Sequence, residues 1–293
     1  MNDRKEGKMK KEMIYELLDH SEKLPVLPLE IQEIMHMLQY PAALDVNRLV
    51  GKVSELKELN EIILKSLNLG YFQTGKRIES IKEAIIRLGL KSVQNLIIFF
   101  ITRQLFPEGD SSKRSFDMHK YWKHVLGTAV AASFLSERLQ KGDKYKLFTY
   151  GLIHDIGIPV MDVCMPEQLD EVGVKLKAGI HQLVAERSVF DGISHAEIGG
   201  WLCRRWNIRE DIINIIEYHH TPLLSRECNE DCLLMHTADV MSSEYYERLL
   251  GININHRISD KIMDMLGLSV QDYRDISQKL PEEVDRINYF LTL

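Results

Sequence analysis

The chain has 293 residues, 45% of them hydrophobic and 27% charged, a length and composition typical of a globular protein with a sizeable core. Its formal net charge of −6 argues against broad nucleic-acid binding and against attraction to an anionic membrane. Because the first residues are polar and no apolar run approaches the roughly 20 residues that span a bilayer, we expect a cytoplasmic protein without membrane contact.

Helices punctuated by proline and glycine are predicted for the first hundred residues. Residues 8–20 repeat apolar side chains with helical spacing, and the extended segment 24–28, with its two prolines, leads into further short helices. The segment Ser80-Ile-Lys-Glu83 has the form of a capping box, in which serine and glutamate satisfy the first N–H groups of a helix. An apolar helix is expected from Val93 to Leu105.

The polar stretch at residues 107–117 shows no periodicity and is the most linker-like part of the chain, so we place a subdomain boundary there. A long helix is predicted from about Met118 to Leu139. The next helix carries His154 near its end. We expect it to stop at Gly157, which can adopt a left-handed conformation, and at Pro159, which cannot continue a helix.

The rest of the chain is also predicted to be helical. Residues 165–187 form a polar helical region, and a second capping box, Ser194-His-Ala-Glu197, opens a helix. A helix is expected from Leu233 to Leu250, and three short helices finish the chain, one of them starting near Ser269. Because no segment alternates apolar and polar residues as strands do, we predict an all-α fold.

Histidines and aspartates occur near the middle or the end of separate predicted helices, and a helical bundle can direct such side chains to one centre. Imidazole and carboxylate groups together are ligands of divalent transition metals. The candidates are His124, His154, Asp155, His195, His219, His220 and Asp239. Each one alone is more often structural, so the order and spacing of the whole set carry the prediction.

The order of His124, then His154-Asp155, then Asp239 on an all-helical chain resembles the HD superfamily of metal-dependent phosphohydrolases. A narrower resemblance, to HDOD domains, the HD-related output modules of bacterial signalling proteins, covers about residues 20–240. It is carried by Leu24–Pro28, Leu67-Asn68-x-x-Tyr71, Ile78–Gly89, Tyr121–His124, Gly151–Gly157, Glu186, His195–Gly199, Trp206 and His219-His220. The resemblance implies a regulatory rather than a metabolic role.

The resemblance also implies a division of the chain. The expected parts are an N-terminal helical extension (1–20), an N-terminal helical subdomain (21–106) packed on a distorted HD-like core (118–250), and C-terminal helices packed on that core (251–293). If a metal is present, we expect it between His124, His154, Asp155 and Asp239, with a second position between His195, His219 and His220. Nitrogen and carboxylate ligands without thiolate favour one or two ions of Fe, Mn or Zn.

Two departures from hydrolases of the HD-GYP type argue against catalysis. Those proteins place a lysine after His-Asp-Ile-Gly, where this chain has Ile158. They also follow His-His with an acidic residue and carry a Gly-Tyr-Pro signature, where this chain has Thr221-Pro222 and no such signature. The positive charge that would meet a phosphate near the metals is therefore missing.

Three interpretations stay open. The leading one is a bacterial signal-transduction module without catalytic residues that acts through contacts with other signalling proteins and retains a metal as a structural or sensory element. The second is a metal-dependent phosphohydrolase acting on a nucleotide or another phosphoester, in which Asp155 would be catalytic. The third is a helical domain that serves assembly and has incidental histidines. A homo-oligomer is compatible with all three.

Overall fold

The computed structural model describes residues 11–40, 43–68, 77–106, 114–225, 229–246 and 258–291. The regular structure of these residues is helical, without a strand among them, which confirms the predicted all-α fold. The elements are α1 (Lys11–Asp19), α2 (Leu29–Gln39), α3 (Val46–Glu55), α4 (Lys57–Leu67), α5 (Ile81–Leu88), α6 (Leu90–Leu105), α7 (Met118–Leu139), α8 (Lys144–Ile153), α9 (Gly157–Cys164), α10 (Pro166–Lys177), α11 (Gln182–Val189), α12 (His195–Arg205), α13 (Glu210–Tyr218), the short 3-10 helix η3 (Pro222–Leu224), α14 (Asn229–Tyr245), α15 (Asp260–Leu266) and α16 (Val270–Leu291).

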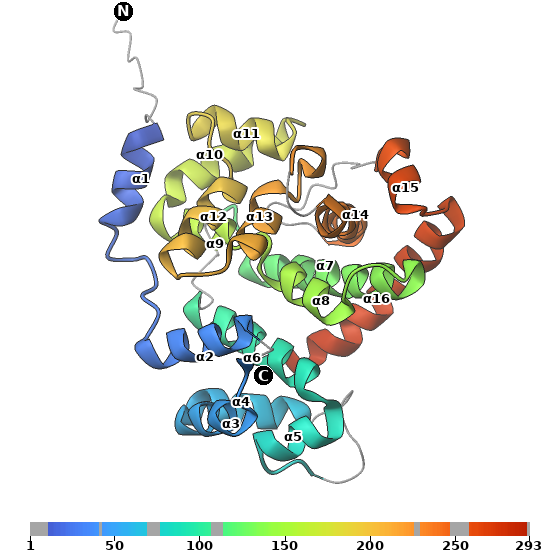
Figure 1. The fold of residues 1–293 in the computed structure, drawn as a ribbon. Helices are drawn as coiled ribbons and strands as arrows, with labels where there is room; N and C mark the ends of the chain where they lie inside the picture. Colours follow the sequence, from blue (N-terminus) through green and yellow to red (C-terminus); the bar gives the residue numbers. More distant parts are fainter. Residues whose placement is uncertain are drawn as a thin grey trace, which may run out of the picture.

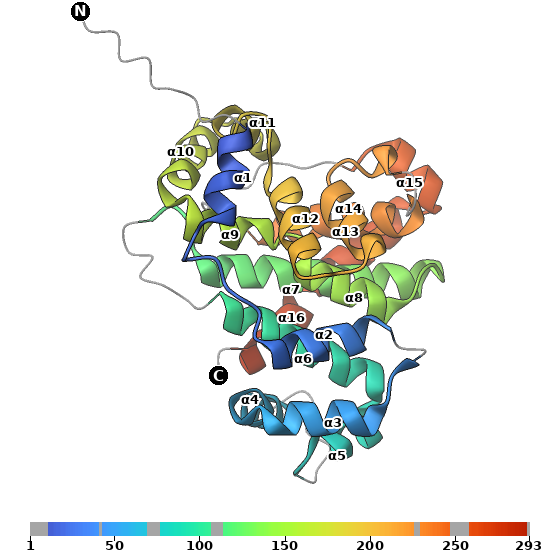
Figure 2. The ribbon, with the colours of Figure 1, turned by 60° about the vertical axis from the view of Figure 1, so that its left-hand side comes forward.

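The helices form two layers (Figure 1 and Figure 2). Helices α2 to α6, the N-terminal layer, lie below helices α7 to α14, the core layer. Helix α6 joins the two, because it packs on α8 of the core layer and on α4 and α5 of its own. Its apolar segment, residues 96–101, explains this position: Phe99 and Phe100 are both buried, and a helix that is apolar around most of its circumference packs on more than one side.

The centre of the core layer is α7, which packs on α8, α14 and α16. Small residues let the α7 and α8 backbones approach closely. A Cβ atom added at Gly151 of α8 would lie 2.4 Å from the Cα atom of Ala129 on α7. Because the two helices are this close, the imidazole rings of His124 and His154 come within 5.4 Å of each other, measured between ring centroids.

The expected stop after His154 is only a three-residue break, because α8 ends at Ile153 and α9 begins at Gly157. The prediction that Gly157 ends a helix in the left-handed conformation is wrong, since Gly157 is not among the glycines with positive φ and starts the next helix. Pro159 lies in the first turn of that helix, where the missing N–H has no intrahelical partner to lose.

Close packing requires glycine at position 157. A Cβ atom there would lie 1.9 Å from the carbonyl oxygen of His195, so only glycine lets α9 and α12 pack in this way. We expect Gly157→Ala to lower the free energy of unfolding by about 1–3 kcal/mol, the usual penalty for overpacking. Denaturant unfolding measures this change.

The matched control for that substitution is Gly51→Ala in α3, where a Cβ atom would meet nothing within 4 Å. Alanine is the better helix former by up to about 1 kcal/mol, so this variant should be neutral or more stable. Equal responses of the two variants would show that the approach of α9 to α12 does not depend on Gly157.

The C-terminal part differs from the prediction of three short helices, because the described residues 258–291 contain two, α15 and the 22-residue α16. The predicted start near Ser269 is correct, since the Ser269 Oγ accepts a hydrogen bond from the Asp272 N–H at 3.0 Å. Helix α16 continues through Pro281 because Ile276, Leu280 and Val284 form one buried stripe across it. It packs on α7 and reaches α4 (Figure 1).

Three other predicted segments have different bounds in the structure. Residues 165–187 hold two helices, α10 and α11, separated by a turn in which Gly179 has a φ of 83°. Helix α14 begins before Leu233 and ends at Tyr245, while residues 247–257 lie outside the described residues. Residues 107–113 of the predicted linker also lie outside them, and the following residue, Arg114, is held by Asp162 and Asp170.

One stretch of the described residues, Lys144–Cys164, is long and apolar enough by composition to cross a membrane, contrary to the expectation from the sequence. It comprises α8, the break and α9, and 72% of its apolar window is buried inside the protein. Burial of this kind is typical of the central helices of a globular core.

Candidate metal centre

The seven predicted side chains converge at one place in the core layer. His124 belongs to α7, His154 and Asp155 to the break after α8, His195 to the first turn of α12, His219 and His220 to the end of α13, and Asp239 to α14. The most exposed of them is His220, with 11% of its side-chain surface accessible, and the other six expose 2% or less. The structure therefore brings together all the candidates from five separate parts of the chain.

The side chains form two adjacent groups of possible ligands, each with its ligand atoms within 4.8 Å of one another. One group consists of His124, His154 and Asp239, and the other of Asp155, His195, His219 and His220. Asp155 was predicted in the first group, but its carboxylate faces both. Its Oδ2 is 3.5 Å from the Nε2 of His124, and its Oδ1 is 3.1 Å from the Nε2 of His195.

Two of the histidines are oriented by the helix ends that carry them. The last carbonyl groups of a helix have no intrahelical partner, and here an imidazole supplies one. The Nδ1 of His154 lies 2.7 Å from the oxygen of Gly151, and the Nδ1 of His219 lies 2.7 Å from the oxygen of Ile216. Because a carbonyl oxygen only accepts, each Nδ1 donates a proton to it, and each Nε2 is left facing the centre.

His195 is oriented by a carboxylate that was not among the predicted site residues. The capping box predicted at Ser194 and Glu197 is present and starts α12 at His195. The Nδ1 of His195 lies 2.7 Å from Oε2 of Glu186, which also accepts the main-chain N–H of His195 at 3.0 Å. Gln182 donates to the other Glu186 oxygen at 2.8 Å.

Glu186 is fully buried, although a glutamate inside a predicted helix is ordinarily solvated. Its presence in the HDOD pattern was the only sequence feature that could have identified it. A carboxylate on the outer nitrogen of a histidine is the arrangement found around metal-binding imidazoles, where it sets the ring orientation. His124 lacks such support, since its Nδ1 is buried without a hydrogen-bond partner.

Burial and neighbouring charges shift the pKa values in this cluster in opposite directions. Burial alone would lower the pKa of His195, but the Glu186 and Asp155 carboxylates outweigh it and raise the pKa to about 10. For His219 burial prevails and lowers the pKa to about 4, so this imidazole is neutral. The two carboxylates thus attract one positive charge to the centre, either a proton or a cation.

The donor set and its spacing fit a divalent cation. His195 Nε2 is 3.4 Å from His219 Nε2 and 3.0 Å from His220 Nε2, and His154 Nε2 is buried without a hydrogen-bond partner. Ligands at roughly 2.0–2.2 Å from one ion lie about 3.0–3.5 Å from each other, so the same spacing suits ligation. Neither group contains a cysteine among the described residues, which leaves nitrogen and carboxylate donors of the kind that Fe, Mn and Zn accept.

The fold and the buried His/Asp centre define an HD-type helical domain. A comparison with known families narrows this classification to one family. The model of the HDOD domain family matches residues 24–222. The chain belongs to the HDOD family.

Solved structures with the same fold cover nearly the whole chain. An HDOD domain protein of unknown function from Geobacter sulfurreducens has a TM-score of 0.75 at 23% identity and covers 95% of both chains. A proposed phosphohydrolase from Shewanella amazonensis SB2B has a TM-score of 0.72 at 20% identity, over 94% of this chain and 97% of the other. A proposed signal transduction protein from Marinobacter aquaeolei VT8 has a TM-score of 0.77 at 20% identity, over 95% and 64%.

A curated relative from Treponema pallidum (strain Nichols), an uncharacterised protein, is 27% identical over 208 residues. The match covers 70% of this chain and 39% of the relative, so this chain spans less than half of the length of that protein. Because the solved structures are only 20–23% identical to this chain, their similarity establishes the fold alone.

Proposed function

We propose that this protein is a regulatory module that binds a divalent metal between its buried histidines and aspartates and acts through contacts with other signalling proteins. Membership of the HDOD family supports the regulatory role. A structural relative with a proposed function in signal transduction is consistent with it.

The burial of the centre is the observation that carries the proposal. A catalytic metal keeps one position open to water and substrate, whereas a structural metal is enclosed by protein ligands. Here six of the seven candidate ligands expose 2% or less of their side chains, and His220 exposes 11%. A centre enclosed in this way suits a metal that holds α7, α12, α13 and α14 together.

Ile158 supports the same conclusion. It lies two residues after the break that carries Asp155, in the first turn of α9, and it is fully buried. An isoleucine cannot compensate the negative charge that develops on a phosphoryl group during hydrolysis, as a lysine can.

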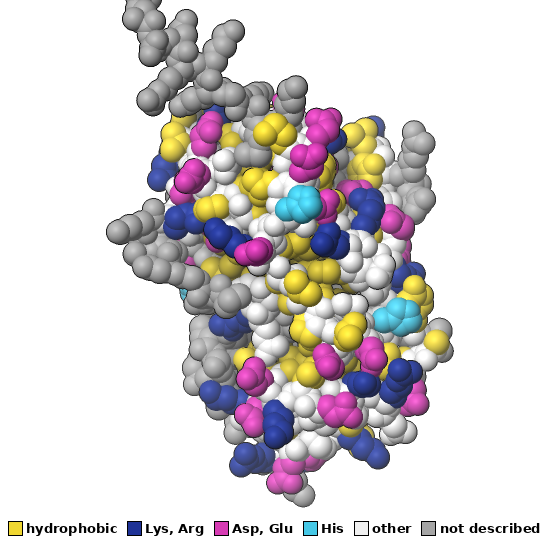
Figure 3. Space-filling model, turned by 90° about the vertical axis from the view of Figure 1, so that its left-hand side faces the viewer, with side chains coloured by type: hydrophobic (Ala, Val, Ile, Leu, Met, Phe, Trp, Pro, Cys, Tyr) yellow, Lys and Arg dark blue, Asp and Glu magenta, His cyan; other side chains and the backbone are white. Residues whose placement is uncertain are grey.

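The surface is suited to protein contacts rather than to nucleic acid. On the face that carries α1 and α2, acidic and basic side chains are interspersed, with hydrophobic side chains between them (Figure 3). Val26, on the segment between these helices, and Leu29, the first residue of α2, are 85% and 73% exposed. Exposed apolar side chains of this kind favour a protein partner.

A metal-dependent phosphohydrolase is the alternative, and the position of Asp155 favours it. A carboxylate between two groups of ligands is what a two-metal hydrolase uses, and Asp155 lies within 3.5 Å of His124 and 3.1 Å of His195. In such an enzyme the ions would activate a water molecule and polarise a phosphoryl oxygen of the substrate.

Metal content and turnover distinguish the two functions. Elemental analysis after anaerobic purification should find one or two ions of Fe, Mn or Zn per chain. Loss of one electrostatic contact to the transition state slows a reaction on the order of 10²–10³-fold. The protein loaded with Fe²⁺ or Mn²⁺ should therefore hydrolyse cyclic dinucleotides and nitrophenyl phosphates far more slowly than ordinary enzymes, whose rates are roughly 1–10³ per second. An active HD-GYP phosphodiesterase assayed in parallel is the positive control, and turnover within the ordinary range would overturn the proposal.

A further inference from the structure

Helix α1 lies on the outside of the core layer, against α12 (Figure 2). It precedes residues 24–222, the part of the chain that the family model matches. Because α1 has only nine residues, and isolated helices shorter than roughly 12–15 residues are marginal in water, it needs contacts with the core layer to stay helical. The strength of its attachment therefore depends on those contacts.

Few side chains attach α1 through apolar contacts. Ile14 and Leu18, one turn apart, are fully buried, and Tyr15 is partly buried. The other six residues of the helix are exposed. Burial of two aliphatic side chains must therefore offset most of the conformational entropy that nine ordered residues lose. Segments attached in this way are at the low end of local stability and open without global unfolding.

The polar contacts of α1 lie at its two ends. Asp19 pairs with Arg205 of α12 at 2.6 Å, and both side chains are about half exposed. The main-chain N–H of Lys11 donates to Asp191 at 3.2 Å, also in solvent. Exposed contacts of this kind add little stability, so they direct α1 to its place without fixing it there.

The surface beneath α1 has the composition of a binding hot spot. The ring of Trp201 on α12 faces that of Tyr15, with 6.3 Å between their centroids. The guanidinium of Arg205 lies 5.7 Å from the centroid of the Trp201 ring. Tryptophan and arginine are among the residues most enriched at the hot spots of protein interfaces. This surface thus offers apolar area and a positive charge side by side.

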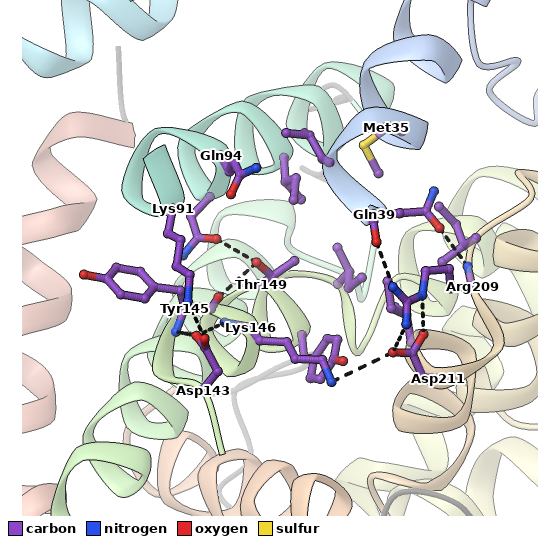
Figure 4. A pocket seen from close by; sticks show the side chains of 17 residues that line it. Met35, Gln39, Lys91, Gln94, Asp143, Tyr145, Lys146, Thr149, Arg209 and Asp211 are labelled. Carbon is purple, nitrogen blue, oxygen red and sulfur yellow. Dashed lines mark hydrogen bonds and ion pairs between the residues drawn. The ribbon is translucent and has the colours of Figure 1, made fainter. Parts of the chain in front are cut away.

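The pocket between the two layers does not offer such a surface (Figure 4). It is lined by α2, α6, α8 and α13, and its charged side chains pair within the protein. Lys91 pairs with Asp143, and Arg209 pairs with Asp211. The charges of that pocket are compensated by its own walls, whereas the cation on α12 pairs with α1 itself.

From these observations we propose that α1 is a displaceable strap, and that the surface beneath it binds an amphipathic helix of a partner protein. The partner helix has the pattern of α1, with aliphatic residues in the places of Ile14 and Leu18. It also has an aromatic residue against Trp201 and a carboxylate for Arg205. Recognition through the apolar face of a helix is a common mode of peptide binding. The proposal rests on the proposed function only in taking the partner to be a protein, and it involves no metal.

A fluorescent peptide with the sequence of residues 11–22 tests the proposal, because it supplies the helix as a separate molecule. Ile14→Asp in the full chain places a charge at a buried position and should release α1. This variant should bind the peptide with a Kd of about 100 µM or tighter. The wild type should bind it at least about tenfold more weakly, since its tethered α1 competes at an effective concentration on the order of 1 mM.

Met13→Asp is the matched control, since Met13 lies on the same helix and is 52% exposed. It introduces the same charge but should bind the peptide as weakly as the wild type does. Trp201→Ala, added to Ile14→Asp, should weaken the peptide at least about tenfold, as expected for a hot-spot residue.

Hydrogen exchange of the wild-type chain is a second measurement, and it needs no variant. The hydrogen-bonded amides of α1 should exchange together and at least about tenfold faster than those of α12. The proposal is overturned if α1 exchanges as slowly as α12, if Ile14→Asp does not bind the peptide at millimolar concentration, or if Met13→Asp binds it as tightly. It is also overturned if Trp201→Ala leaves the affinity unchanged, or if the wild type is a dimer that Ile14→Asp dissociates, because a second copy would then hold the surface.

Discussion

Replacement of His154 with alanine should remove most of the metal and lower the free energy of unfolding by about 4 kcal/mol, the stabilisation by a ligand present at roughly a thousand times its dissociation constant. The substitution deletes a candidate ligand nitrogen and the hydrogen bond of Nδ1 to Gly151. It also removes the imidazole whose Nε2 lies 3.4 Å from Asp155 and 3.7 Å from Asp239. For a chain of 293 residues this change corresponds to a melting temperature lower by about 6–7 °C. Thermal unfolding and elemental analysis of the same samples measure the two effects.

The matched control is His119→Ala, because His119 is exposed on α7 one turn before His124. It should keep both the metal and the melting temperature of the wild type. A chelator should destabilise the wild type and the His119 variant but leave the His154 variant nearly unchanged. If His154→Ala instead abolishes robust phosphoester hydrolysis at an unchanged melting temperature, the protein is an enzyme and the regulatory proposal is wrong.

Glu186 is the second position at which a large effect is expected. Glu186→Ala should lower the free energy of unfolding by about 3–5 kcal/mol, because it breaks a buried pair and leaves His195 and Gln182 without their acceptor. Glu186→Gln keeps the shape but replaces one acceptor oxygen by a donor. Metal affinity should then fall about 10–100-fold, as for other residues that orient metal-binding histidines.

Metal titration and chemical unfolding of both Glu186 variants test this role. Glu171→Gln is the control, since Glu171 is exposed on α10 and contacts Lys175 on the next turn. It should change neither quantity. Wild-type metal affinity in Glu186→Gln would show that the carboxylate stabilises the fold without orienting His195 for a metal.

Local rules predicted much of the fold correctly. The capping box at Ser194 placed His195 in the first turn of α12, and the bounds of α7 agree with its apolar period. The same rules were wrong at Gly157, and they predicted three short C-terminal helices where the described residues hold two. Gly157 and Pro281 are both residues that commonly stop a helix, but close packing explains the first and a continuous buried stripe carries α16 through the second.

The candidate ligands were recognised from residue type, order and resemblance, and the structure brings all seven together. Their role in binding a metal stays a prediction. Glu186 was not predicted as a site residue, because its contact with His195 spans nine positions and two helices.

By itself the sequence determined the helical class, the family and the chemical nature of the donors at the centre. Caps, stops and periodicity act within one or two turns of a helix, so residues close in the chain are sufficient to read them. Only the tertiary structure decided that Asp155 faces both groups of ligands and that Glu186 orients His195. These properties depend on distances between atoms far apart in the chain, which the packing of whole helices sets.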